Sequence, residues 1–318
     1  MWLGSSVGFA ATGCAQGPIP GRMSLPREVA PGRFYLITRR CTQRTFLLRP
    51  DRATNQAVLY CMALAAQRAR IEVVLPCVLS NHHHAVVYDR YGTYPAFIEH
   101  FHKLVARSQN ALRGRWENFW SSEQTCVVRL VGADDVMNKL VYVATNPVKD
   151  HLVDRVDHWP GVNGLGALLG RRPIVVNRPR HFFRSNGKLP AAVTLTFEIP
   201  PELGDADAVL ATLNARVKAV EAETAAERSR TGRRVLGRPR GTAPGVAHDR
   251  STSREPRRNL RPTVAARSVW ARIEALQRNR DFVAAYRAAR ALWVSGQEAW
   301  FPAGTYWLRR FANIRVAA

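Results

Sequence analysis

The chain has 318 residues, of which 46% are hydrophobic, so it is long enough to bury one sizeable core or two modest ones. Its 47 Lys and Arg outnumber its 24 Asp and Glu, and the formal charge of +23 favours nucleic acid or another polyanion as a partner, although a basic tail alone would give the same balance. The five cysteines are scattered and form no C-x-x-C pair, which argues against a disulfide framework and is typical of reduced thiols in a cytosolic protein. No apolar run approaches the roughly 20 residues that span a bilayer, so we expect no membrane association.

The first 22 residues are small, rich in Gly and Ala, and uncharged until Arg22. They lack the basic start of a secretory signal peptide. Met23, followed by Ser-Leu-Pro-Arg, looks like a more natural start. We therefore expect residues 1–22 to be a disordered leader or an over-extended gene start.

Apolar patterns and turn residues predict seven elements in the first half of the chain. Asp51 can cap a helix, Pro95 opens a second one, and a third begins with Asp134 as its cap and ends at Pro147. In chain order we predict a strand at 33–40, a helix at 51–69, strands at 71–75 and 82–88, a helix at 95–112, a strand at 125–131 and a helix at 134–146. This β-α-β-β-α-β order followed by a helix is that of ferredoxin-like α+β folds, in which an antiparallel sheet carries two helices on one face.

The pattern weakens after the predicted domain at 23–160. Residues 161–227 form a connector in which we predict a strand at 192–199 and a helix at 205–228. Residues 228–262 are rich in Arg, Pro and Gly and poor in apolar residues, which predicts a basic linker or disordered arm. Residues 263–318 show helical periodicity and end in an aromatic, basic stretch whose role the sequence leaves open.

Three consecutive histidines lie within the predicted strand at 82–88. Because side chains alternate along a strand, His82 and His84 share one face and His83 points to the other. Two imidazoles on a rigid strand make half of a divalent-metal site, and the third ligand must come from elsewhere. A chance run or a structural histidine cluster would give the same pattern.

The predicted third helix carries a candidate nucleophile. Asn138, Tyr142 and Asn146 follow one another at a spacing of four, on a face separate from the apolar stripe. A metal, a tyrosine and an amide together suit nucleophilic chemistry on a phosphodiester. Tyr142 as a core residue, and Asn146 before Pro147 as simple helix termination, are the alternatives.

Two segments in this order resemble the motifs of the single-tyrosine HUH transposases, and most of all those of the REP-associated tyrosine transposases. They are Leu79-Ser-Asn-His-His-His-Ala-Val-Val87 and Tyr142-Val-Ala-Thr-Asn-Pro-Val-Lys149, and the resemblance covers roughly residues 27–160. Two positions depart from the family pattern: His83 stands where an aliphatic residue is usual, and Asp150-His151 stands where the family has Ala-Gly.

The resemblance implies a ferredoxin-like nuclease fold with a catalytic helix, followed here by a basic, partly disordered C-terminal extension. It implies Tyr142 as the nucleophile, and His82, His84 and Asn146 as ligands of a divalent ion, Mg or Mn. It also implies cleavage and rejoining of single-stranded hairpin DNA through a 5′-phosphotyrosine intermediate. The protein would act as a monomer or homodimer in the bacterial cytoplasm, associated with the nucleoid.

The high content of Arg and Lys supplies candidates for binding the DNA backbone. Gly237-Arg-Pro-Arg240 resembles the core of an AT-hook, although a solvated linker would look the same. The candidate nucleic-acid-binding residues are Arg39, Arg40, Lys103, Arg107, Arg113, Lys149, Arg238 and Arg240.

Two other functions stay open on the sequence. One is a non-catalytic DNA- or RNA-binding regulator on the same scaffold. The other is a histidine-based metallohydrolase that attacks nucleic acid through water. A covalent protein–DNA adduct is expected only of the transposase-like enzyme.

Overall fold

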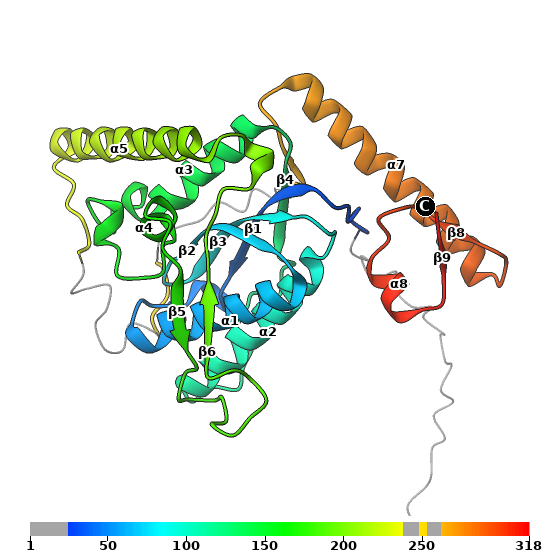
Figure 1. Cartoon of the computed structure of the whole chain (residues 1–318), viewed down its shortest axis with the longest axis horizontal. Helices are drawn as coiled ribbons and strands as arrows, with labels where there is room; N and C mark the ends of the chain where they lie inside the picture. The colour runs from blue at the N-terminus through cyan, green and yellow to red at the C-terminus, as the bar shows by residue number, and fades with distance from the viewer. Residues whose placement is uncertain (1–24, 238–247, 253–261, 318) are drawn as a thin grey trace, which may run out of the picture.

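A five-stranded sheet in the order β2-β3-β1-β4-β7 forms the centre of the molecule (Figure 1). The computed structural model describes residues 25–237, 248–252 and 262–317. The strands of the sheet are β1 (Arg33–Arg40), β2 (Glu72–Val78), β3 (His82–Asp89), β4 (Cys126–Leu130) and β7 (Val264–Ala265). The first four pair antiparallel and β7 adds to β4 in parallel, so the protein is an α+β protein with a mixed sheet.

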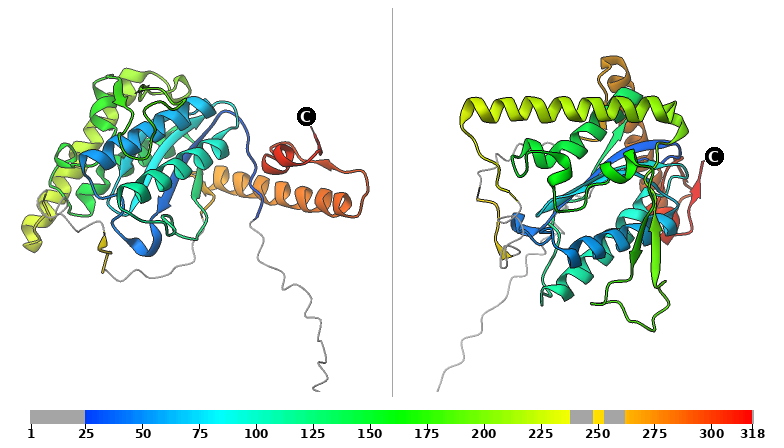
Figure 2. Two further views of the ribbon diagram at one scale, coloured as in Figure 1. Left: turned by 90° about the horizontal axis from the view of Figure 1, so that it is seen from below. Right: turned by 60° about the vertical axis from the view of Figure 1, so that its left-hand side comes forward.

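Helices cover both faces of this sheet. The long ones are α1 (Arg52–Ala69), α2 (Tyr94–Leu112), α3 (Ala133–Lys149), α5 (Ala206–Thr231) and α7 (Val269–Val294). The right-hand view of Figure 2 shows α1 and α2 on one side of the sheet, with α3 on the other side and α5 lying across α3. The predicted pair of helices on one face is therefore present, and the third helix packs on the opposite face.

Local chemistry explains where α1 and α2 begin. The Asp51 side chain accepts a hydrogen bond from the Thr54 N–H at 2.7 Å, which caps the first turn of α1 as predicted. The Asp89 carboxylate accepts from the Thr93 and Tyr94 N–H groups at the start of α2. The α2 residue Phe101 is buried against the sheet.

Both predicted ends of α3 were wrong by a few residues. Gly132, not Asp134, is the N-cap, because its N–H donates to the Asp135 side chain at 2.9 Å. Pro147 does not end the helix, which continues to Lys149. Proline lacks only its own N–H, and the Asp150 N–H still donates to the Asn146 carbonyl at 3.0 Å.

The second half of the described chain packs onto this core in three parts, one of which is α5 against α3. A hairpin of β5 (Ile174–Asn177) and β6 (Ala192–Leu195) lies against α1, and the Tyr60 hydroxyl donates to the Pro190 carbonyl at 2.6 Å. The short elements are η1 (Thr42–Arg44), η2 (Val156–His158), α4 (Leu165–Leu169), η3 (Pro201–Leu203), β8 (Trp300–Phe301), α8 (Trp307–Phe311) and β9 (Arg315–Val316). Residues 262–317 form a C-terminal unit of β7, α7, β8, α8 and β9, which Figure 2 shows beside the sheet in its left-hand view.

Residues 228–237, 248–252 and 262 of the predicted basic arm at 228–262 are described. The predicted start of the arm was wrong, because α5 continues to Thr231, and the Leu236 N–H then donates to the His151 carbonyl at 2.9 Å. Residues 248–252 run beside the chain that follows β1, where the Phe46 N–H donates to the Asp249 carbonyl at 2.8 Å. The Arg44 guanidinium donates to the Ser251 hydroxyl at 2.8 Å. This part of the arm is therefore docked on the core.

Candidate active site

The predicted histidine and tyrosine side chains meet in one cavity of about 380 Å³. Strand β3 contributes His82 and His84, helix α3 contributes Tyr142, and β1 contributes Thr38. The loop before β4, residues 121–124, forms the remaining wall. Elements from both halves of the predicted nuclease unit thus converge here.

The alternation along β3 divides the three histidines between two faces. The rings of His82 and His84 lie 4.8 Å apart, and the His84 ring lies 5.2 Å from the Tyr142 ring. His83 is fully buried on the other face, where its Nε2 lies 2.8 Å from His102 Nε2 and its ring contacts Phe101 of α2. His83 therefore belongs to the packing of the sheet against α2.

Neighbouring side chains orient the two histidines of the cavity. Thr38 lies opposite His84 in the β1–β3 register, and its hydroxyl is 2.8 Å from His84 Nδ1. The Asn81 side-chain oxygen is 2.7 Å from His82 Nδ1. With Nδ1 of His84 engaged, its Nε2 faces the Tyr142 hydroxyl at 3.5 Å. Hydrogen bonding through one ring nitrogen is how proteins fix a metal-binding imidazole.

Burial sets the protonation states in this cavity. It lowers the pKa of His84 well below its ordinary value, and the charges of His82 and His83 lower it further. A neutral imidazole is the form that binds a metal ion. Burial also raises the pKa of Tyr142, as does the charge of Asp150, and these outweigh the opposing hydrogen bond of Asn146. The phenol is therefore protonated at neutral pH and is a weak nucleophile on its own.

Asn146 lies one turn beyond Tyr142 on α3 and is buried. Its side-chain oxygen has no hydrogen-bond partner within the described part of the chain. A buried amide oxygen without a partner is costly, and a cation would satisfy it. The described residues contain no group of three His, Cys, Asp or Glu that could hold a metal ion, so a site here needs Asn146 beside His82 and His84. Two imidazole nitrogens and an amide oxygen are donors that a divalent ion accepts, but Asn146 is not among the residues that line the cavity with His82 and His84.

Three arginines line the same cavity. Arg39 donates to the Thr125 hydroxyl at 2.8 Å, and Arg40 lies 3.7 Å from the Glu123 carboxylate. Arg44 is the third, and sequence reasoning missed it. It follows β1 in an irregular segment with positive φ, so no pattern in the sequence predicts its position. The role of Asn81 was also missed, although it directly precedes the predicted strand.

The predicted DNA-binding residues of α2 lie away from the cavity. Lys103 and Arg107 are exposed on the side of the sheet opposite Tyr142. The guanidinium of Arg113 is buried, donating to the Leu47 carbonyl at 2.9 Å and pairing with Asp51 at 3.6 Å. Arg113 therefore stabilises the loop before α1.

Three predicted DNA-binding residues remain, Lys149, Arg238 and Arg240. Lys149 is exposed and is the last residue of α3. Arg238 and Arg240 lie outside the described residues.

Within the described ranges, no helix is long and apolar enough to cross a bilayer.

No family model matches the chain, and no curated protein matches it either. Among solved structures, one of a REP-associated tyrosine transposase bound to a REP hairpin is similar to it, with a TM-score of 0.40 and 17% identity. That match covers 53% of this chain and 95% of the other. Similarity at this level does not show that the two proteins share a family.

Proposed function

We propose that this protein is a metal-dependent, single-tyrosine DNA transposase that cleaves and rejoins single-stranded hairpin DNA. The observation that carries the proposal is the position of the Tyr142 hydroxyl, 3.5 Å from His84 Nε2 in a cavity lined by three arginines. The strand order β2-β3-β1-β4 with two helices on one face supports the ferredoxin-like form of the nuclease unit.

The proposed reaction is an in-line displacement at phosphorus. Tyr142 loses its proton and attacks the scissile phosphate, the bond to the 3′-oxygen breaks, and that oxygen gains a proton. The 5′-phosphate stays on Tyr142 until a 3′-hydroxyl reverses the step, so the exchange needs no ATP. A divalent ion, Mg or Mn, held by His82, His84 and Asn146 would neutralise charge on the phosphate.

The chain's own residues supply position and charge. Asn81 and Thr38 fix the orientations of His82 and His84. Arg40 pairs with His82 in the β1–β3 register, lines the cavity and offers positive charge to the phosphates that flank the scissile bond. The Arg39 guanidinium lies toward His102 and donates to the Thr125 hydroxyl and the Ser121 carbonyl. Burial raises the pKa of Tyr142 and so favours the protonated phenol in the cavity.

A covalent adduct tests the proposal directly. Purified protein is incubated with 3′-labelled hairpin DNA and Mn²⁺, then resolved on denaturing gels, because the fragment that stays joined to Tyr142 through its 5′-phosphate carries the 3′ end. We expect an adduct with wild-type protein and none with Tyr142→Phe, which should still bind the DNA. Tyr91→Phe is the matched control, because Tyr91 is an exposed tyrosine outside the cavity, and it should form the adduct normally.

Two results would contradict the proposal. An adduct of wild-type strength from Tyr142→Phe would mean that another residue attacks the DNA. Tight hairpin binding by wild-type protein without any adduct, at several metal concentrations, would favour the non-catalytic regulator.

A further inference from the structure

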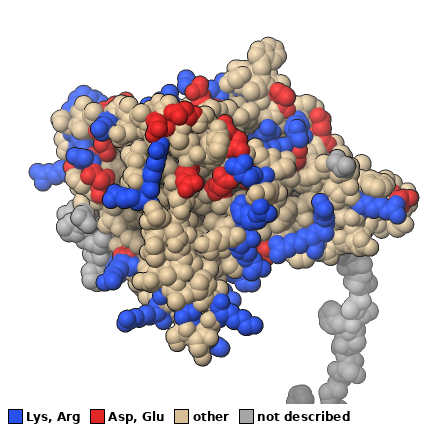
Figure 3. All heavy atoms as spheres, viewed as in Figure 1, with Lys and Arg blue, Asp and Glu red and all other residues tan. Residues whose placement is uncertain are grey.

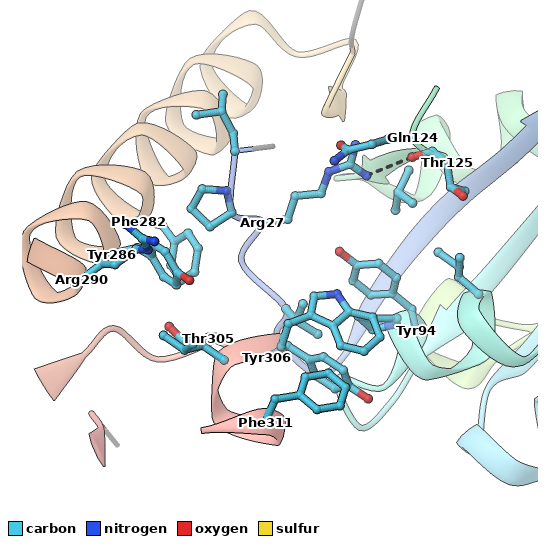
Figure 4. A pocket seen from close by; sticks show the side chains of 18 of the residues that line it. Arg27, Tyr94, Gln124, Thr125, Phe282, Tyr286, Arg290, Thr305, Tyr306 and Phe311 are labelled. Atoms are coloured by element: carbon cyan, nitrogen blue, oxygen red, sulfur yellow. Dashed lines mark hydrogen bonds between the residues drawn. The ribbon is translucent and has the colours of Figure 1, made fainter. Parts of the chain in front are cut away.

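We infer that a second cavity binds unpaired nucleotides of the same DNA strand that Tyr142 cleaves, an inference that rests on the proposed function. This cavity has a volume of about 790 Å³ and lies between the C-terminal unit and the core (Figure 4). We call it the aromatic cleft and define it by Tyr94, Tyr286, Tyr306, Trp307 and Phe311. Its volume is in the range of cavities that hold organic ligands.

The walls of the aromatic cleft come from four parts of the chain, one of which is the start of α2 with Tyr94. Figure 4 shows Tyr286 projecting from α7, Tyr306 and Phe311 from the α8 region, and Gln124 from the opposite wall. The segment that precedes β1 runs between them and contributes Arg27. The cleft therefore exists only because the C-terminal unit docks beside the core.

Exposed aromatic rings make the cleft a surface for stacking. Trp307 is 43% exposed and Phe311 is 73% exposed. Their rings are nearly parallel, with an interplanar angle of 6° and centroids 5.9 Å apart. The Arg310 guanidinium lies near both rings, 5.6 Å from the Trp307 centroid and 5.5 Å from that of Phe311. The ring surface that stays exposed is available to a nucleobase, which stacks on such rings without needing a specific sequence.

The charge of the aromatic cleft favours a polyanion over an apolar peptide. Arg27, Arg287 and Arg290 line it, and the one acidic residue among its described lining residues is Glu99. Glu99 already pairs with Arg310 at 3.1 Å. Aromatic faces with arginines around them are the combination that binds single strands, with rings for the bases and guanidinium groups for the phosphates.

The position of the cleft links it to the proposed active site. Gln124 lines both cavities. At the next residue, the Thr125 hydroxyl accepts from Arg39 of the catalytic cavity, and the Thr125 carbonyl accepts from Arg27 of the aromatic cleft. A strand leaving the catalytic cavity past this loop would enter the aromatic cleft.

The test compares two DNA hairpins by fluorescence anisotropy, without divalent metal so that no cleavage occurs. One hairpin carries an unpaired flank of about ten nucleotides, and the other is blunt. We expect the Trp307→Ala, Phe311→Ala double variant of the full chain to lose about tenfold in affinity for the flanked hairpin and less than about twofold for the blunt one. Trp270→Ala is the matched control, because Trp270 is 80% exposed on α7 and outside the aromatic cleft, and it should bind both hairpins like wild type.

A conservative variant separates stacking from folding. Trp307→Tyr keeps a stacking ring and should retain most of the affinity for the flanked hairpin. Wild-type affinity of the double variant for the flanked hairpin would overturn the inference. A change of oligomeric state in the double variant with unchanged DNA affinity would also overturn it, since the cleft would then be a protein interface.

Adduct formation, measured in parallel, separates this inference from the proposed function. Loss of flank binding in the double variant supports the cleft even if wild-type protein forms no adduct. Normal adduct formation with no loss of flank binding rejects the cleft and leaves the proposed function standing.

Discussion

Thr38 positions the proposed metal ligand His84. Its hydroxyl lies 2.8 Å from His84 Nδ1 and fixes the direction in which Nε2 points. Thr38→Val keeps the shape of the side chain and removes that partner. We expect Mn²⁺ affinity, measured by isothermal titration calorimetry, to fall about tenfold, because loss of such an orienting hydrogen bond commonly costs that much.

The control for this variant is another strand threonine. Thr194→Val lies on β6, outside the cavity, and should leave Mn²⁺ affinity unchanged. Unchanged affinity in Thr38→Val, with the thermal midpoint of wild type, would contradict the orienting role of Thr38.

His102 links pH to the stability of the fold. Burial, aided by the charge of Arg39, lowers its pKa from 6.5 to about 3. Below pH 6.5 the unfolded chain takes up a proton at this residue that the folded chain does not, so stability is full above pH 6.5 and falls as the pH drops toward 3. Between about pH 7.5 and 5.5 this residue alone should cost about 1.4 kcal/mol in the free energy of unfolding.

Urea unfolding at these two pH values measures the effect. From pH 7.5 to 5.5 the free energy of unfolding of His102→Gln should fall by about 1.4 kcal/mol less than that of wild type. Above about pH 7.5 the free energies of unfolding of the two proteins should change with pH at the same slope. Equal losses in both proteins would show that His102 is not held neutral in the folded state.

At the scale of elements, the sequence predicted most of the unit between residues 33 and 149. Alternating and helical patterns placed four strands and three helices between residues 33 and 149, in the observed order. Each end of α3 depends on individual hydrogen bonds. At the N-terminus the Asp135 side chain accepts from the Gly132 N–H, and near the C-terminus Pro147 removes one backbone hydrogen bond while the Asp150 N–H still donates to the Asn146 carbonyl. The spacing of apolar residues in the sequence cannot predict individual hydrogen bonds at a helix end.

The elements that sequence reasoning missed depend on partners distant in the chain. Strand β7 has two residues, and only its pairing with β4 makes it a strand. Strand β5 fell within a segment that looked like a basic connector, and it forms by pairing with β6. Arg44 reaches the cavity through the same kind of tertiary placement, which no local pattern reports.

Helix α5 supports the helix that carries the proposed nucleophile. Leu213 of α5 is fully buried, and α5 packs along α3. Leu213→Ala should lower the free energy of unfolding by about 3 kcal/mol through the lost burial and the cavity it leaves. Leu276→Ala on α7 is the control, because Leu276 is 39% exposed, and it should cost less than about 1 kcal/mol. Equal losses in urea unfolding would contradict the supporting role of α5.

At the scale of the molecule, the proposed function would depend on the net charge and on how the C-terminal unit is attached to the core. On the face shown in Figure 3, Asp and Glu lie mostly in the upper half, whereas Lys and Arg dominate the lower half. With a net charge of +23, much of the affinity for DNA should come from release of counterions and should fall steeply with salt. In the proposed function, selection of hairpin over duplex would come from the two cavities, because counterion release is insensitive to DNA sequence and occurs on duplex as well.

The C-terminal unit is joined to the core by backbone bonds as well as by charge. The Arg129 N–H donates to the Thr263 carbonyl at 2.9 Å, and the Val29 N–H donates to the Gly304 carbonyl at 3.0 Å. Arg278 pairs with Glu28 at 2.7 Å. The sequence left the role of residues 263–318 open, and in the structure β7 of this unit forms the outer strand of the sheet beside β4.

A chain ending at residue 262 tests what that edge contributes. Because β4 would lose its outer partner, we expect the thermal midpoint to fall by about 5 °C and the exposed edge to promote aggregation. His82, His84, Tyr142 and Asn146 all remain on β3 and α3, so the truncated protein should still form the adduct with a blunt hairpin. A chain ending at residue 313 is the control, since it keeps β7 and α7 and should retain the midpoint of the full chain. If the folded 262-residue chain binds blunt hairpin DNA but forms no adduct, the C-terminal unit is part of the catalytic machinery. Folding excludes a loss of stability as the cause, and a blunt hairpin has no unpaired flank that would need the aromatic cleft.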